Sequence, residues 1–198
     1  MGELRRLFFA VPVEPEVASM LSQHLSRWEI PGKVVPPANW HLTVRFLGWT
    51  DPVKGEVVTA LVDQAGRGGP FRLTLGALGA FPRATRAGVL WLGLDRGEEG
   101  LAALNRVVEE AAQTAGFQPE ERPFAAHLTL SRLRPPADVS ALIDDYEPRE
   151  FRWQAQELIL YDSRPGPVYV PVERFPLVPT RSEDDVGRLP RGGRHDRG

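Results

Sequence analysis

The chain of 198 residues contains no cysteine. It therefore has no disulfide framework, no thiolate nucleophile and no cysteine-rich zinc site. A strong excess of one charge is also missing, because the formal net charge is -2 and the sequence pI is about 6.1. This balance argues against a protein that coats nucleic acid with a strongly cationic surface, although it leaves room for a local basic groove.

Long hydrophobic runs are missing as well. No segment approaches the ~18 consecutive apolar residues that suggest a membrane span. Two arginines precede a short apolar run near the start, but Glu14, Pro15 and Glu16 interrupt it without a small-residue cleavage pattern. Arg6 also breaks the myristoylation pattern after Gly2. We therefore expect a cytoplasmic protein without membrane attachment.

What the chain does contain is enough apolar sequence, 42% of its residues, to bury the core of one domain. Apolar patterns predict strands near 4–13, 40–47, 71–78, 88–94, 124–133, 151–161 and 168–175. They predict helices over 51–64, 98–115 and 139–145, and one starting near Pro15 with the apolar stripe Val17, Met20, Leu21, Leu25 and Trp28. This order predicts an α+β, bilobal duplicated fold, with two antiparallel-rich sheets and outer helices around a central cleft.

We expect residues 1–178 to form this single domain, with the two lobes interleaved. Residues 179–198 are rich in glycine and charge and have almost no apolar anchors, so burial cannot offset the entropy of ordering them. We expect a disordered charged tail that is dispensable, although its arginines could contact RNA.

The clearest motif is His-Leu-Thr followed by an aliphatic residue, which occurs at His41 and again at His127. Histidine titrates near neutral pH, so two of them facing one cavity could supply a general base and a general acid. Alternate side chains of a strand share a face, which predicts two polar groups of three residues: His41, Thr43 and Arg45, and His127, Thr129 and Ser131.

Other interpretations of the two histidine motifs have less support from the sequence. One such histidine alone is most often structural, and the pair is more informative than either copy. Neither copy has the spacing or the neighbouring ligands of common zinc sites, and no GxSxG elbow supports a serine triad. We expect His24 to be packed at the edge of the core, whereas His195 lies in the tail.

The segments HLTVRFLG, GAFPRATRAGVLWLGL, ERPFAAHLTLSRL and ELILYDSRP occur in this order. Together they resemble the bacterial and archaeal RNA 2′,3′-cyclic phosphodiesterases, also called 2′-5′ RNA ligases, of the two-histidine phosphoesterase superfamily. The resemblance covers about Leu4 to Leu177. It departs from the usual pattern at Ala125 and Ala126, which replace a basic residue and a proline that often precede the second histidine.

The resemblance implies an enzyme that opens a terminal 2′,3′-cyclic phosphate to a 2′-phosphate without a metal or other cofactor. It implies that His41 donates a proton to the departing 3′-oxygen and that His127 activates water. Thr43 and Thr129 would hold non-bridging oxygens. Run backwards, the reaction would join a 5′-hydroxyl to the cyclic phosphate without ATP.

Arginines near the motifs are candidates for phosphate binding. Arg132 matches the basic position after the family's second motif, but strand alternation places it on the face opposite His127 unless a bulge intervenes. Arg45 shares the alternation of His41, and a surface charge is an equal alternative. Arg83 and Arg86 are candidates for contacts with backbone phosphates.

We expect the partners to be RNA ends with a 2′,3′-cyclic phosphate, tRNA fragments included, with no membrane and no obligate protein partner. The chain is expected to be a monomer. Alternative enzyme functions are phosphodiesterases for small cyclic phosphates or for 2′-5′ oligoadenylates. An alternative of another class is a non-catalytic module that binds RNA ends.

Overall fold

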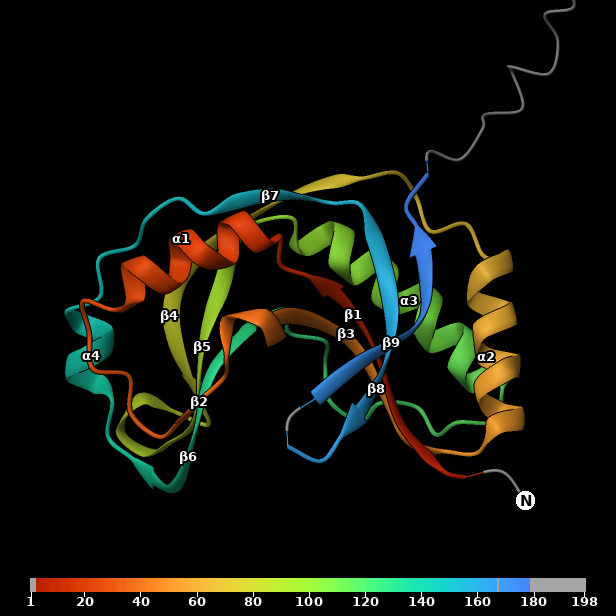
Figure 1. Ribbon diagram of the computed structural model, residues 1–198, viewed down its shortest axis with the longest axis horizontal. Coiled ribbons are helices and arrows are strands. Elements are labelled where there is room, and N and C mark those ends of the chain that lie inside the picture. Colours follow the sequence, from red (N-terminus) through yellow and green to blue (C-terminus); the bar gives the residue numbers. More distant parts are fainter. Residues whose placement is uncertain (1–2, 167, 179–198) are drawn as a thin grey trace, which may run out of the picture.

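The computed structural model describes residues 3–166 and 168–178. Its α+β class agrees with the expected fold, and its strands pair antiparallel in one curled sheet (Figure 1). The strand order is β7-β4-β5-β6-β3-β1-β8-β9, and β2 pairs with β6. The strands are β1 (Arg5–Pro12), β2 (Lys33–Val34), β3 (His41–Thr50), β4 (Phe71–Phe81), β5 (Ala87–Arg96), β6 (Leu128–Ala137), β7 (Arg152–Ala155), β8 (Glu157–Arg164) and β9 (Val168–Pro176).

The two motif strands, β3 and β6, lie at the centre of this order. In the described part of the chain a single ladder pair, Leu42 with Leu128, joins them. We call β3, β1, β8 and β9 lobe 1, and β6, β5, β4 and β7 lobe 2. The two expected sheets are therefore halves of one sheet, connected at the motifs themselves.

The helices are α1 (Pro15–Leu25), α2 (Pro52–Gln64), α3 (Glu98–Thr114) and α4 (Ser140–Asp144), with short 3-10 turns at Pro37–Asn39 and Ala84–Arg86. Asp51 begins α2 as predicted, because its Oδ1 accepts a hydrogen bond of 3.0 Å from the Lys54 amide. No helix among the described residues is both long and apolar enough to cross a membrane.

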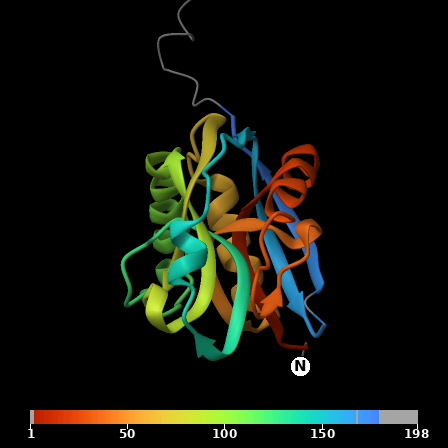
Figure 2. The ribbon, with the colours of Figure 1, turned by 90° about the vertical axis from the view of Figure 1, so that its left-hand side faces the viewer.

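Helices α1 and α3 each connect strands of one lobe but pack on the other. Helix α1 follows β1 of lobe 1, yet its His24 is buried against Tyr146 and Phe151 beside lobe 2, and His24 Nε2 lies 3.1 Å from the Glu147 carbonyl. Helix α3 follows β5 of lobe 2 and packs on β3 of lobe 1. Figure 2 shows α1 and α3 on opposite sides of the strands. His24 is therefore buried at the edge of the core, as expected.

Two sequence expectations about elements were wrong. The segment 151–161 is not one strand, because β7 pairs with β4 at the outer edge of lobe 2 and β8 pairs with β1 in lobe 1. The alternation of Phe151, Trp153 and Ala155 is interrupted at Gln156 and Glu157, but such an interruption does not by itself show that the chain changes lobe. Met20, expected on the apolar stripe of α1, is 53% exposed. The predicted tail, residues 179–198, lies outside the described residues, so its disorder stays a prediction.

Candidate active site

Both motif histidines lie at the junction of the two lobes. His41 begins β3 and His127 immediately precedes β6. Leu42 and Leu128 are fully buried and point to the opposite side of the sheet. Continuing their antiparallel register by one residue places Thr43 towards His127 and Thr129 towards His41. The two copies therefore meet on one side of the sheet, which we call the histidine face.

Each imidazole is held by the same backbone contact. Nδ1 of His41 lies 2.7 Å from the carbonyl oxygen of Asn39, and Nδ1 of His127 lies 2.8 Å from that of Ala125. A carbonyl oxygen can only accept, so Nδ1 carries the proton and donates it in both rings. Nε2 is then left, in each neutral ring, as the atom that can take up a proton.

The surroundings of both rings disfavour the imidazolium form. Burial lowers the pKa of His41 to about 4, outweighing the hydrogen bond to Asn39, and the charges of Arg132 and His127 lower it further. Burial also lowers the pKa of His127, and Arg132 again adds to the effect. Arg132 is thus electrostatically coupled to both histidines, as a residue of the histidine face would be.

A bulge in β6 turns the side chain of Arg132 towards the histidine face. On β5 the neighbours Leu90 and Trp91 pair with Ser131 and Thr129, so Leu130 is an extra residue. Val89 pairs with Arg132, which puts Arg132 on the same face as Thr129. The bulge that the functional interpretation of Arg132 required is therefore present. The grouping of Ser131 with His127 and Thr129 was wrong, because Ser131 is turned away and fully buried.

The first motif has a bulge at the equivalent position. On β1 the neighbours Phe9 and Ala10 pair with Arg45 and Thr43, so Val44 is the extra residue of β3. Phe46 consequently shares the histidine face and is 49% exposed there. It corresponds in position to Arg132, five residues after the histidine in each copy. The two copies therefore differ at this position, which holds an arginine in one and a phenylalanine in the other.

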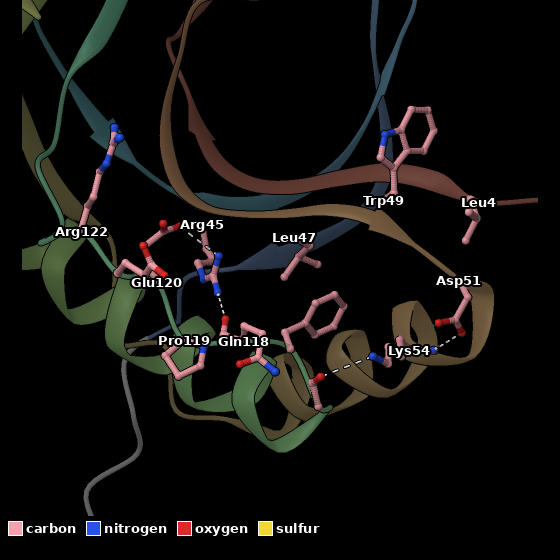
Figure 3. Close-up of a pocket in the computed structure, with 13 residues that line it drawn as sticks. Leu4, Arg45, Leu47, Trp49, Asp51, Lys54, Gln118, Pro119, Glu120 and Arg122 are labelled. Carbon is pink, nitrogen blue, oxygen red and sulfur yellow. Dashed lines mark hydrogen bonds and ion pairs between the residues drawn. The ribbon is translucent and has the colours of Figure 1, made fainter.

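Arg45 is turned to the other side of the sheet, which corrects the expectation that it shares a face with His41. It is 8% exposed and forms ion pairs with Glu109 of α3 and Glu120. Its Nη2 also donates to the carbonyl of Gln118 over 2.6 Å (Figure 3). Its guanidinium donates hydrogen bonds to Gln118 and Glu120, in the segment that leads to His127. Arg45 is therefore not a candidate for contact with substrate.

Figure 3 also shows residues that line a pocket on this side of the sheet. The volume of this pocket is about 600 Å³. Trp49, Lys54, Phe117 and Arg122 are among the residues that line it, and neither motif histidine is. Its position on the side of Arg45 separates it from Nε2 of both histidines. This pocket is therefore distinct from the candidate site on the histidine face.

Thr43 and Thr129 are both partly exposed next to the histidines. Within residues 3–166 and 168–178, neither hydroxyl has a hydrogen-bond partner. Each hydroxyl can therefore donate to an oxygen of a bound group. The structure brings Thr43, Thr129 and Arg132 onto the histidine face, whereas their contacts with substrate stay proposals.

Aromatic side chains surround the histidines, and the sequence motif gave no signal for most of them. His41 packs against Phe8 and Tyr169, with ring centroids 5.0 and 5.2 Å away. The Phe81 ring lies 5.1 Å from that of His127 and stacks near Trp91. These rings exclude water from both imidazoles, which is the physical origin of their lowered pKa values.

Metal ligands are not gathered in the described part of the chain, where no group of three His, Asp or Glu side chains could hold an ion. The two histidines do not amount to such a set by themselves. Independence from metal ions stays a prediction that a chelator can test.

Comparison with known proteins gives one consistent family. The 2′-5′ RNA ligase superfamily matches residues 15–167. Proteins called RNA 2′,3′-cyclic phosphodiesterase in Aquifex aeolicus and Escherichia coli are each 31% identical to this chain, over 86% and 90% of it and 94% and 99% of their own lengths. The crystal structure of E. coli LigT complexed with 3′-AMP is 28% identical, covers 88% of this chain and 99% of its own, and superposes with a TM-score of 0.74. The chain belongs to the 2′-5′ RNA ligase superfamily.

Proposed function

We propose that this protein hydrolyses 2′,3′-cyclic phosphate ends of RNA to 2′-phosphates without a metal ion. The observation that carries the proposal is the pair of imidazoles on one face, each with Nδ1 bonded to a backbone carbonyl and Nε2 left for proton transfer. The names of the relatives in A. aeolicus and E. coli support the same substrate.

In the proposed reaction, His127 Nε2 takes a proton from water as the water oxygen attacks phosphorus. The bond from phosphorus to the 3′-oxygen breaks, and His41, which is protonated on Nε2 when the anionic substrate is bound, gives that proton to the oxygen. In-line displacement needs these two groups on opposite sides of phosphorus, which two motifs on facing strands can provide. The products are a 2′-phosphate and a 3′-hydroxyl.

Negative charge on the phosphoryl oxygens is taken up by Thr43, Thr129 and Arg132. The two hydroxyls are unpartnered among the described residues, and the guanidinium is exposed on the same face. Such donors stabilise charge that builds during displacement. In the reverse direction a 5′-hydroxyl replaces water, which gives a 2′-5′ linkage without ATP.

The test uses an RNA 5-mer with a 2′,3′-cyclic phosphate end in the presence of EDTA. Wild-type protein should release the 2′-phosphate, and His41→Ala and His127→Ala should each lower kcat by at least about a hundredfold, as expected when a general acid or base is removed. His195→Ala, which changes the same residue type in the tail, is the matched control. Full activity in either single variant contradicts the mechanism, and activity that EDTA abolishes supports metal catalysis instead.

The same assay separates the alternatives. Preference for a small cyclic phosphate or a 2′-5′ oligoadenylate over the 5-mer would change the proposed substrate while keeping the two histidines. Tight RNA binding without turnover, unaffected by His41→Gln, would indicate a binding module. The expected monomeric state and cytoplasmic location stay predictions.

A further inference from the structure

Three cationic side chains lie together next to the proposed site. Lys33 of β2 pairs directly with Arg132 of β6, and cross-strand partners point to the same face of a sheet. Arg134 is two residues beyond Arg132 and so also shares its face. These residues, with Gly32, line a pocket of about 400 Å³.

The pocket depends on a close approach of two backbones. A Cβ atom at Gly32 would lie 2.7 Å from the carbonyl oxygen of Arg132, and Gly32 has a φ of +83°. Both facts restrict this position to glycine. Three residues later, the Val35 amide donates to the carbonyl of Leu130 over 2.8 Å and so satisfies the bulge that directs Arg132. The same segment therefore places Lys33 and supports the geometry of the site.

The charges in this pocket are not compensated. In the part of the chain that the structure describes, no ion pair joins Lys33, Arg132 or Arg134 to an acidic residue, and all three are exposed. Like charges directly opposite on neighbouring strands destabilise a sheet. The net charge of the whole chain is -2, so this local excess is not a general property of its surface. A bound anion would relieve the repulsion.

We propose that Lys33 and Arg134 form a second phosphate subsite, which binds the 5′-phosphate of the nucleotide that carries the cyclic phosphate. The inference rests on the proposed function, since Arg132 holds the cyclic phosphate and the subsite lies next to it. In RNA this 5′-phosphate links the terminal nucleotide to the preceding one. The subsite therefore makes the enzyme prefer RNA ends to free nucleosides with a cyclic phosphate.

The decisive comparison uses two substrates that differ by one phosphate: adenosine 2′,3′-cyclic phosphate and the same compound with a 5′-phosphate. Wild-type kcat/KM should be about tenfold higher for the second, which corresponds to one charge-assisted contact. In the double variant K33Q/R134Q this ratio should fall to about one. The control is R96Q/R106Q, which removes the same charge from exposed arginines at the end of β5 and in α3 and should keep the ratio.

A ratio near one in the wild type, or an unchanged ratio in K33Q/R134Q, overturns the subsite, while hydrolysis of the RNA 5-mer upholds the proposed function. If neither the two nucleotides nor the 5-mer is hydrolysed, the proposed function fails, and thermal unfolding with inorganic pyrophosphate still tests the subsite. Pyrophosphate should raise Tm more in the wild type than in K33Q/R134Q, because a ligand stabilises the state that binds it. Equal rises in the two proteins contradict the subsite.

Discussion

The imidazole of His41 is enclosed by aromatic rings and lies near a cationic arginine, and both surroundings oppose its protonation. A pKa of about 4 means that the ring is neutral in the free protein at neutral pH. As a proton donor, His41 must gain its proton in the presence of substrate. A bound phosphate supplies the negative charge that raises the pKa of both histidines again.

We expect kcat/KM to follow a bell-shaped pH profile with its optimum below pH 6.5, because one imidazole must be protonated, the other neutral, and both pKa values are lowered from that ordinary value. In R132Q the histidines lose a repelling positive charge, so their pKa values rise and the profile moves to higher pH. R132K keeps the charge and should keep the wild-type profile at a lower rate. An unmoved profile in R132Q would show that Arg132 lies too far from the histidines.

The low pKa of His41 also predicts how stability depends on pH. The unfolded chain protonates this histidine near its ordinary value of 6.5, whereas the folded protein does so only near 4. Falling pH therefore favours the unfolded state through this window, and the lost contribution is about 3 kcal/mol. Urea unfolding at pH 7 and pH 4 should show a smaller fall in unfolding free energy for H41Q than for the wild type. Equal falls would mean that His41 titrates normally.

At the scale of strands, two bulges decide which side chains reach the site. Each bulge adds one residue after the His-x-Thr sequence, and each extra carbonyl has its own donor. The Asn105 side chain donates to Val44 over 2.8 Å, and the Val35 amide donates to Leu130 over 2.8 Å. Strict alternation of side chains along a strand predicts the correct face for the first three residues of each motif. After the bulge it predicts the wrong face.

Arg45 links β3 to helix α3 and to the segment before His127. Replacing it with methionine leaves Glu109, whose side chain is 19% exposed, without its cation and frees the carbonyl of Gln118. We expect R45M to lose about 2 kcal/mol of unfolding free energy, below the loss for a fully buried pair because Glu109 and Glu120 keep contact with water. Its kcat should also fall, since Arg45 holds the start of the segment that leads from Gln118 to His127.

Urea unfolding and initial rates measure these two effects, and R106Q on the exposed side of α3 is the control, with an expected change within about 0.5 kcal/mol. If R45M matches R106Q in both, the Arg45 network does not support the site.

At the scale of the molecule, neither lobe is formed by one continuous half of the chain. Lobe 1 contains β1 and β3 from the start together with β8 and β9 from the end, and each lobe is covered by a helix that connects strands of the other. The indole Nε1 of Trp153 in β7 donates to the Pro12 carbonyl in β1 over 3.1 Å, which adds a direct link between the lobes.

Because each lobe is covered by a helix that connects strands of the other lobe, we expect cooperative unfolding. Circular dichroism and tryptophan fluorescence should give one coincident urea transition, because neither lobe keeps its covering helix when the other unfolds. Tryptophans occur in both parts, for instance Trp49 in β3 and Trp91 in β5, so fluorescence reports on both lobes. Two separated transitions would show that the lobes are independent folding units.

The sequence by itself determined the fold class and most element positions, and it predicted the two candidate histidines, because apolar periodicity and a repeated motif are local properties of the chain. It could not determine that 151–161 divides between two lobes, that Arg45 and Ser131 turn away, or that Phe46, Trp91 and Tyr169 gather around the histidines. Those outcomes depend on bulges and on pairing between distant strands. Only the tertiary structure fixes the register, and a register shift of one residue moves a side chain to the other face.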